Sequence, residues 1–240
     1  MIKTDKKEIY RYLGYRGSEP DPNVAAAVDQ CLDQLQSAVT PRYVFRKFEV
    51  EHISGAGEAD GADRADGTDG TDRADGAEIL RIAGTEIRSR ALARNLRGCS
   101  QVYLMAATLG MGPDRLITRA SVSQMSRAVI LQAAAAAMIE AWCDEVNRMI
   151  IREASSQGLH CRPRFSPGYG DFSIDHQRDF AQILRLQKEI GLSLTQTLLM
   201  MPSKSVTAVI GLSDEKSDCL LQGCEMCGKR EECAFSRIGT

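Results

Sequence analysis

The sequence has no long apolar run. Its longest uncharged apolar stretch, 128–139, is interrupted by Gln132 and consists mainly of alanine, whereas a helix that spans a bilayer needs about 18 consecutive apolar residues. We therefore expect no membrane-spanning helix. Residues 1–14 are charged and lack the apolar core of a secretory signal, which predicts a cytoplasmic protein.

Aromatic residues and net charge are also scarce. Aromatic side chains make up 5 % of the 240 residues, and the formal net charge is −2. Proteins that bind nucleic acids need an excess of basic groups, and those that bind single strands add aromatic stacking platforms. Neither feature is present, so we expect no nucleic-acid partner.

The acidic charge is concentrated in one segment. Residues 55–78 hold eight acidic and two basic side chains, and the rest of the chain holds 24 acidic and 28 basic ones. Aspartate recurs at every third position from Asp60 to Asp75, with no bulky apolar residue between. Without apolar anchors the segment cannot offset its ordering entropy and lacks the pattern of calcium-binding repeats. We expect a disordered acidic insertion that lengthens a hairpin loop.

Apolar periodicity predicts a mixture of helices and strands. Helices are expected over the first residues and over 20–39, 87–96, 114–120, 122–156 and 179–190, with strands over 43–53, 78–82, 101–108 and 206–212. The order shows no strict strand–helix alternation. It predicts an α+β fold, a mainly antiparallel twisted sheet with flanking helices. The strand over 101–108 leads into a glycine turn that superficially resembles a nucleotide loop but lacks its lysine.

The stretch 164–171 is the most informative for function. Pro167, Gly168 and Gly170 fix an irregular path that holds Arg164 and Tyr169 close together in sequence. An arginine pairs well with a carboxylate, and glycine allows a ligand to approach the backbone. From composition alone, a plain surface turn with a solvated Arg164 is the favoured interpretation.

Three motifs in this order resemble the reactivation (activation) domain of cobalamin-dependent methionine synthase. They are the helical stretch 139–145, with Glu140 before an alanine and an aromatic residue, the R-x-x-P-G-Y loop at 164–169, and M-x-P-x-x-S-V at 200–206. Thr207 and Ala208 follow where the family has Ser-Gly. The resemblance covers about residues 125–212, and the 106–110 stretch AATLG is similar to the separate activation proteins of the family.

The resemblance implies a binding site for S-adenosylmethionine. Carried over motif by motif, Arg164 would hold the ligand carboxylate and the backbone around Ser166 the adenine edge. Pro167 and Gly168 would shape the turn, and Tyr169 would line the pocket. Glu140 would take a polar or ammonium group of the ligand, although an exposed helical carboxylate is its simplest alternative.

The implied function is that of a free-standing activation subunit. It would bind S-adenosylmethionine for reductive methylation of the cobalamin held by a methionine synthase subunit or another corrinoid protein, with flavodoxin or ferredoxin as reductant. Two alternatives stay open: a module that only docks onto a corrinoid protein, and a metal-binding interaction protein without a role in methyl transfer.

Cysteines gather near the C-terminus. Cys219, Cys224, Cys227 and Cys233 fall within 15 residues, while four others are scattered. In a cytoplasmic protein such a cluster indicates a metal site rather than disulfides, and an iron–sulfur cluster and tetrahedral zinc both fit four thiolates. Free thiols, or a three-ligand site without Cys219, are the alternatives. The expected division is 1–54 for the N-terminal helices and first strand, 55–78 for the insertion, 79–212 for the rest of the domain, and 213–240 for the Cys-rich tail.

Overall fold

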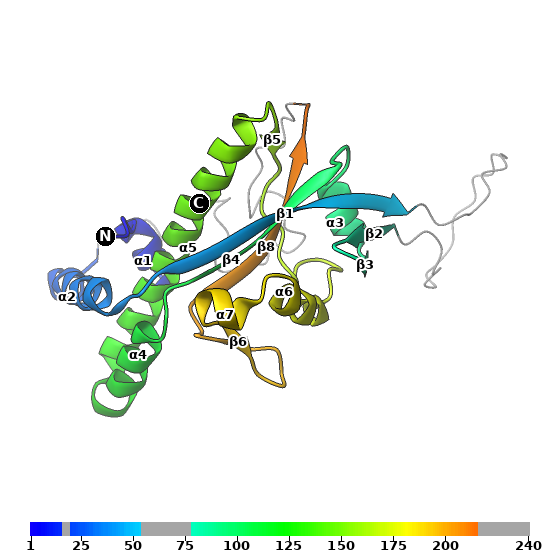
Figure 1. Cartoon of the computed structure of the whole chain (residues 1–240). Coiled ribbons are helices and arrows are strands. Elements are labelled where there is room, and N and C mark those ends of the chain that lie inside the picture. The colour runs from blue at the N-terminus through cyan, green and yellow to red at the C-terminus, as the bar shows by residue number, and fades with distance from the viewer. Residues whose placement is uncertain (16–19, 54–77, 216–240) are drawn as a thin grey trace, which may run out of the picture.

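The computed structural model describes residues 1–15, 20–53 and 78–215 (Figure 1). The helices are α1 (Lys6–Tyr12), α2 (Pro22–Ala38), α3 (Arg90–Asn95), α4 (Gly112–Ser123), α5 (Met125–Ser155), the 3₁₀ helix η1 (Ile174–His176), α6 (Gln177–Ile183) and α7 (Leu186–Ile190). The strands are β1 (Arg42–Ile53), β2 (Ile79–Ile82), β3 (Thr85–Arg88), β4 (Gln101–Thr108), β5 (His160–Cys161), β6 (Ser193–Leu194), β7 (Met200–Met201) and β8 (Ser205–Ser213).

The strands form a six-stranded sheet in the order β3-β2-β1-β4-β8-β5, and β6 and β7 form a separate two-stranded ribbon. Every neighbouring pair in the large sheet is antiparallel. The expected α+β class with a mainly antiparallel sheet is therefore confirmed. Ile53 at the end of β1 pairs with Ile79 at the start of β2, so the acidic segment connects two adjacent strand ends.

Helices cover both faces of the sheet, and the alternation of side chains along β4 shows how. Tyr103 and Met105 point into the core on the side of α5, whereas Val102 and Leu104 point into a second core with α3, α6 and α7. Successive strand residues face opposite sides of a sheet. A central strand covered on both faces is therefore apolar at nearly every position, as β4 is between Gln101 and Thr108.

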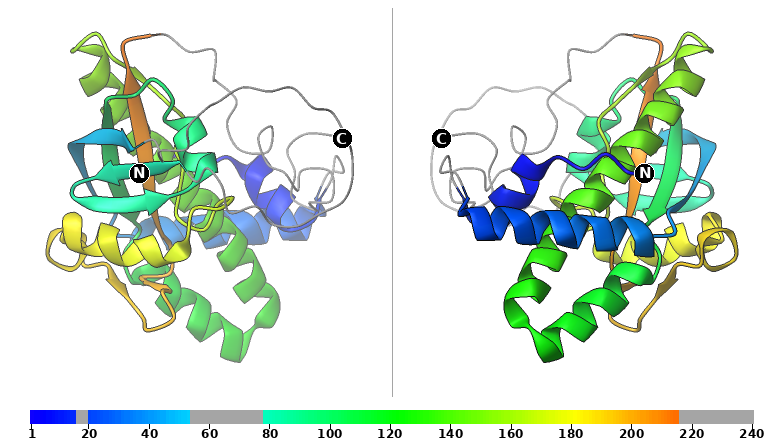
Figure 2. Two further views of the ribbon diagram at one scale, coloured as in Figure 1. Left: turned by 90° about the vertical axis from the view of Figure 1, so that its right-hand side faces the viewer. Right: turned by 90° about the vertical axis from the view of Figure 1, so that its left-hand side faces the viewer.

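Helix α5 is the central helix of the larger core. It packs against α1, α2, α4 and the sheet, and Figure 2 shows α2 crossing it. Its buried face carries Ala133, Ala134, Ala135 and Ala137, whose small side chains let the neighbouring elements approach closely. No helix in the described part of the chain is both long and apolar enough to cross a membrane.

The glycine turn after β4 serves packing. A side chain at Gly110 would collide with Thr40, and one at Gly112 would collide with the backbone of Ala38. Gly110 also has a φ of +77°, which glycine adopts without strain. The turn is thus packed closely against Ala38 at the end of α2 and against Thr40.

Two expected helices differ from the structure. The segment expected as one helix over 87–96 begins in β3, where Ile87 pairs with Leu80, and becomes helical only after Ser89 caps α3. The helix expected over 179–190 is divided by Arg185, whose φ of 55° lies in the left-handed region. Its predicted C-cap, Gly191, is confirmed by a φ of 70°.

Candidate ligand-binding site

Arg164 is positioned by the edge of the large sheet. After β5 the chain continues along β8: the N–H of Phe165 donates to the carbonyl of Val209 (2.9 Å), and the N–H of Val209 donates back (2.8 Å). Phe165 packs into the core beside α6. Because neighbouring side chains of an extended segment point to opposite faces, Arg164 is directed to the side of α5.

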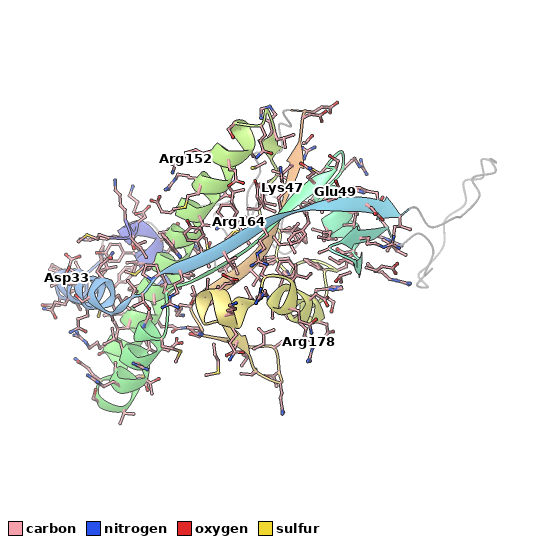
Figure 3. All side chains as sticks on the ribbon, in the orientation of Figure 1. Asp33, Lys47, Glu49, Arg152, Arg164 and Arg178 are labelled. Carbon is pink, nitrogen blue, oxygen red and sulfur yellow. The ribbon has the colours of Figure 1, made fainter. Side chains whose placement is uncertain are left out.

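On that side Arg164 meets two carboxylates of α5. Its Nη2 lies 3.0 Å from Oδ1 of Asp144 and 3.4 Å from Oε2 of Glu140. Positions four apart on a helix lie on one face, so both carboxylates point the same way. Figure 3 labels Arg164 between α5 and β1 in this view. One guanidinium is therefore held by two carboxylates that the sequence places at least 20 residues away.

The guanidinium is largely buried, but one of its nitrogens has no partner. The side chain of Arg164 is 21 % exposed, and its Nη1 is buried without a hydrogen-bond partner in the described part of the chain. Burial raises the pKa of the adjacent Cys143 thiol to about 12, against the opposing effect of Arg164. Cys143 is thus a neutral thiol at physiological pH, and it adds no negative charge to the site.

The loop after Arg164 forms a compact turn. The N–H of Tyr169 donates to the carbonyl of Ser166 (3.2 Å), and the N–H of Gly168 donates to the carbonyl of Phe172 (2.7 Å). Gly168 has a φ of +96°, and a Cβ there would lie 3.2 Å from the Ile174 side chain. Pro167 is buried beneath the turn, while the side chain of Tyr169 is 66 % exposed. Local geometry alone therefore accounts for the glycine.

A carboxylate anchors the far end of this turn. Asp171 accepts hydrogen bonds from the Ser89 hydroxyl (2.6 Å) and from the backbone N–H groups of Arg90 (2.8 Å) and Ala91 (3.0 Å). These groups form the N-terminus of α3, which lacks intrahelical partners for its first N–H groups. Burial tends to raise the pKa of Asp171, but these hydrogen bonds outweigh it and lower the pKa below its usual value.

The third motif, M-x-P-x-x-S-V at 200–206 together with Thr207, stabilises the sheet. The Ser205 hydroxyl donates to the Thr108 hydroxyl (2.8 Å), and that of Thr207 donates to the side-chain carbonyl of Gln177 (2.8 Å). Asp114 at the start of α4 accepts from the backbone N–H of Ser203 (2.8 Å). The motif thus fixes the start of β8, the strand whose Val209 forms hydrogen bonds with the backbone of Phe165.

The structure brings together some of the predicted residues. Glu140 and Arg164 are in direct contact, and Ser166, Pro167, Gly168 and Tyr169 form the adjoining turn. Two residues that position the site were missed: Asp144, signalled by its spacing of four from Glu140, and Asp171, whose partners lie some 80 residues away. The predicted metal ligands Cys219, Cys224, Cys227 and Cys233 lie outside the described residues. Within residues 1–15, 20–53 and 78–215, no cluster of His, Cys, Asp or Glu is arranged to hold a metal ion.

The predicted binding residues do not line the cavity at the end of β1 and β2 in the described part of the chain. That cavity has a volume of about 250 Å³ and is bordered by His52, Ile79, Arg97 and Cys99. Glu140 and Asp144 have side chains that are 45 % and 54 % exposed. The site around Arg164 is accordingly a surface open to solvent on the side of α5.

Comparisons with known proteins give one informative result. No protein-family model matches the sequence, and no curated protein sequence matches it either. A solved structure described as the crystal structure of the MetH reactivation domain bound to AdoHcy is similar in fold. The TM-score is 0.59 and the identity 14 %, over 89 % of this chain and 75 % of that one. The expected reactivation-domain fold is confirmed.

Proposed function

We propose that this chain is an activation subunit that binds S-adenosylmethionine and presents it for reductive methylation of a cobalamin held by a partner protein. The ligand would bind at Glu140, Arg164 and the turn formed by Ser166, Pro167, Gly168 and Tyr169. The partner would be the cobalamin-binding subunit of a methionine synthase or another corrinoid protein, with flavodoxin or ferredoxin as the electron donor.

One observation carries the proposal. The fold brings the guanidinium of Arg164 within 3.4 Å of the carboxylate of Glu140, although they belong to separate motifs 24 residues apart. The solved structure with a similar fold is bound to AdoHcy, which is S-adenosylmethionine without its transferable methyl group. Motifs and fold thus point independently to the same class of ligand.

The residues present suit the groups of this ligand. Its amino-acid end carries a carboxylate and an ammonium, which match Arg164 and the carboxylates of α5. A guanidinium binds a carboxylate best with two nitrogens, and because Nη1 of Arg164 is buried, the second of these bonds would form only after the side chain rotates. Gly168 presents bare backbone, and Tyr169 presents an exposed ring 6.4 Å from that of Phe165.

The role of the protein in this reaction is placement. S-adenosylmethionine supplies the methyl group from its sulfonium, a transfer that needs no general acid or base. Arg164 and Glu140 orient the amino-acid end, and the turn at 166–169 supports the nucleoside. The cofactor carries the difficult chemistry. The contribution left to the protein is to hold the reactants in position, which can account for much of the rate of such a step.

Calorimetric titration with S-adenosylmethionine tests the proposal. We expect the wild-type protein to bind, and Arg164→Ala to weaken binding by about 2–3 kcal/mol, the contribution of a hydrogen bond to a charged group. Arg178→Ala is the matched control, because Arg178 is exposed on α6 and forms no ion pair with another described residue. It should bind like the wild type.

The outcome that contradicts the assignment is an Arg164→Ala protein that unfolds at the wild-type temperature and binds equally well. Absence of binding by the wild type at millimolar ligand would also refute it. Addition of a corrinoid protein, reductant and S-adenosylmethionine then tests activation: recovery of methylated cobalamin in the visible spectrum should depend on this chain. A chain that binds the ligand but leaves the spectrum unchanged would serve docking only.

A further inference from the structure

We infer that the site selects S-adenosylmethionine over its demethylated product by charge, and that Asp144 is the residue that determines this preference. The inference rests on the proposed function, because it concerns the same ligand site. It follows from the charges that the fold places around one guanidinium.

The described charges at the site sum to minus one. Arg164 contributes one positive charge, and Glu140 and Asp144 each contribute one negative charge within 3.4 Å of it. Arg148 lies one turn further along α5 and is engaged by Glu145 at 2.7 Å, so this pair is internally balanced. Asp171, at the far end of the loop 164–171, accepts hydrogen bonds from the N-terminus of α3.

The methyl donor balances this arrangement, and the demethylated product does not. S-adenosylmethionine brings a carboxylate, an ammonium and a sulfonium, so the combined site would hold three positive and three negative charges. S-adenosylhomocysteine lacks the sulfonium charge. With it the site would hold two positive and three negative charges, and one carboxylate of α5 would lack a cationic partner.

Asp144 is the carboxylate on which this difference depends. It is the closer partner of Arg164, at 3.0 Å against 3.4 Å for Glu140. When a ligand carboxylate takes its place at Nη2, the released carboxylate of Asp144 faces the bound ligand, and the other described cation that acts on it, Arg148, is already engaged by Glu145 at 2.7 Å. The sulfonium of S-adenosylmethionine would supply the cationic partner that Asp144 then lacks.

Solvent limits the size of the preference. The side chain of Asp144 is 54 % exposed, and charge pairs at exposed positions are strongly screened. A unit charge a few ångströms away in such surroundings changes an affinity by about fivefold, and added salt reduces the change. Product release after methyl transfer would be favoured by the same factor.

The test is the ratio of the two affinities, which cancels any effect common to both ligands, including competition of Asp144 for Arg164. Titrations with S-adenosylmethionine and S-adenosylhomocysteine are compared for the wild type, Asp144→Asn and Asp33→Asn. Asp33 is an exposed carboxylate on α2 that lies well apart from Arg164 in Figure 3. The last variant therefore changes the net charge by the same amount.

We expect the wild type to favour the sulfonium ligand by about fivefold, Asp33→Asn to keep this ratio, and Asp144→Asn to reduce it toward one. High salt should reduce the wild-type ratio in the same way. A ratio that is equal in the wild type and Asp144→Asn would overturn the inference, as would a wild type that binds both ligands equally. A wild type that binds neither ligand would instead refute the proposed function.

Discussion

Asp171 links the candidate ligand loop to a distant helix, and its removal should destabilise the fold measurably. Its carboxylate accepts three hydrogen bonds, from the Ser89 side chain and from the backbone of Arg90 and Ala91. The substitution Asp171→Asn keeps the size of the side chain but removes its charge and one of its acceptor oxygens. At least one of the first N–H groups of α3 then loses its partner.

The size of the effect follows from these contacts. Loss of a capping side chain costs about 0.5–2 kcal/mol of stability. Asparagine retains one acceptor, and Asp171 is exposed, so we expect a loss near the middle of that range, about 1 kcal/mol. In a domain of this size such a loss lowers the midpoint of thermal unfolding by roughly 2–4 °C.

The effect should depend on pH in one direction. The folded-state pKa of Asp171 lies below its usual value, and the unfolded-state pKa of aspartate is about 3.9. Such a group stabilises the fold fully above the unfolded-state pKa, and this contribution disappears as the pH falls through the lowered folded-state value. The difference between wild type and Asp171→Asn should therefore be full at neutral pH and shrink below about pH 4.

Urea unfolding of both proteins at neutral and acidic pH measures this difference. Asp33→Asn is the control, because the Asp33 carboxylate accepts no hydrogen bond from another described residue, and it should change stability little. If Asp171→Asn and Asp33→Asn have the same free energy of unfolding at neutral pH, the carboxylate does not cap α3. A difference that grows on acidification would contradict the direction worked out above.

Two predictions concern segments outside the described residues and rest on the sequence alone. Deletion of residues 57–76 should leave ligand binding intact and shift the unfolding midpoint by less than about 5 °C, because this segment contains no apolar anchor; a larger fall would mean that it packs against the fold. Anaerobically purified protein should contain stoichiometric zinc, or iron with sulfide, which Cys224→Ser with Cys227→Ser removes without loss of S-adenosylmethionine binding. Metal-free protein with four alkylatable thiols in the tail would refute this.

The sheet and its partners were predictable because their sequence signal is local. β4 is apolar at nearly every position, and Asp21 with Pro22 marks the start of α2, where the Asp21 carboxylate accepts from the N–H of Asn23 at 2.8 Å. The period of a short apolar run is ambiguous, so Ile87 was assigned to a helix although it lies in β3. The break at Arg185 has no local signal, because it depends on how α6 and α7 pack beneath the sheet.

The site was predictable only in part for a related reason. A resemblance between motifs predicted a binding role for Glu140 and Arg164, and the structure shows them in direct contact, which depends on the crossing of α5 with the sheet edge. Asp144 shares a helical face with Glu140, which the spacing alone indicates. Asp171 is different: its partners on α3 are fixed by tertiary structure, and no pattern within the loop distinguishes it from a solvated carboxylate.

The way the loop at 164–171 is held bears on how a ligand would enter the proposed site. Both backbone groups of Phe165 are bonded to Val209, and Asp171 is bonded to α3 at the other end, so the backbone on either side of the turn is fixed. Arg164 precedes the first of these anchors and therefore keeps its Cα in place. Exchange of the Asp144 carboxylate for a ligand carboxylate then needs only side-chain rotation on an exposed helix face. We therefore expect the proposed site to bind its ligand without a rearrangement of the fold, with the charges around Arg164, rather than a closing lid, deciding what it accepts.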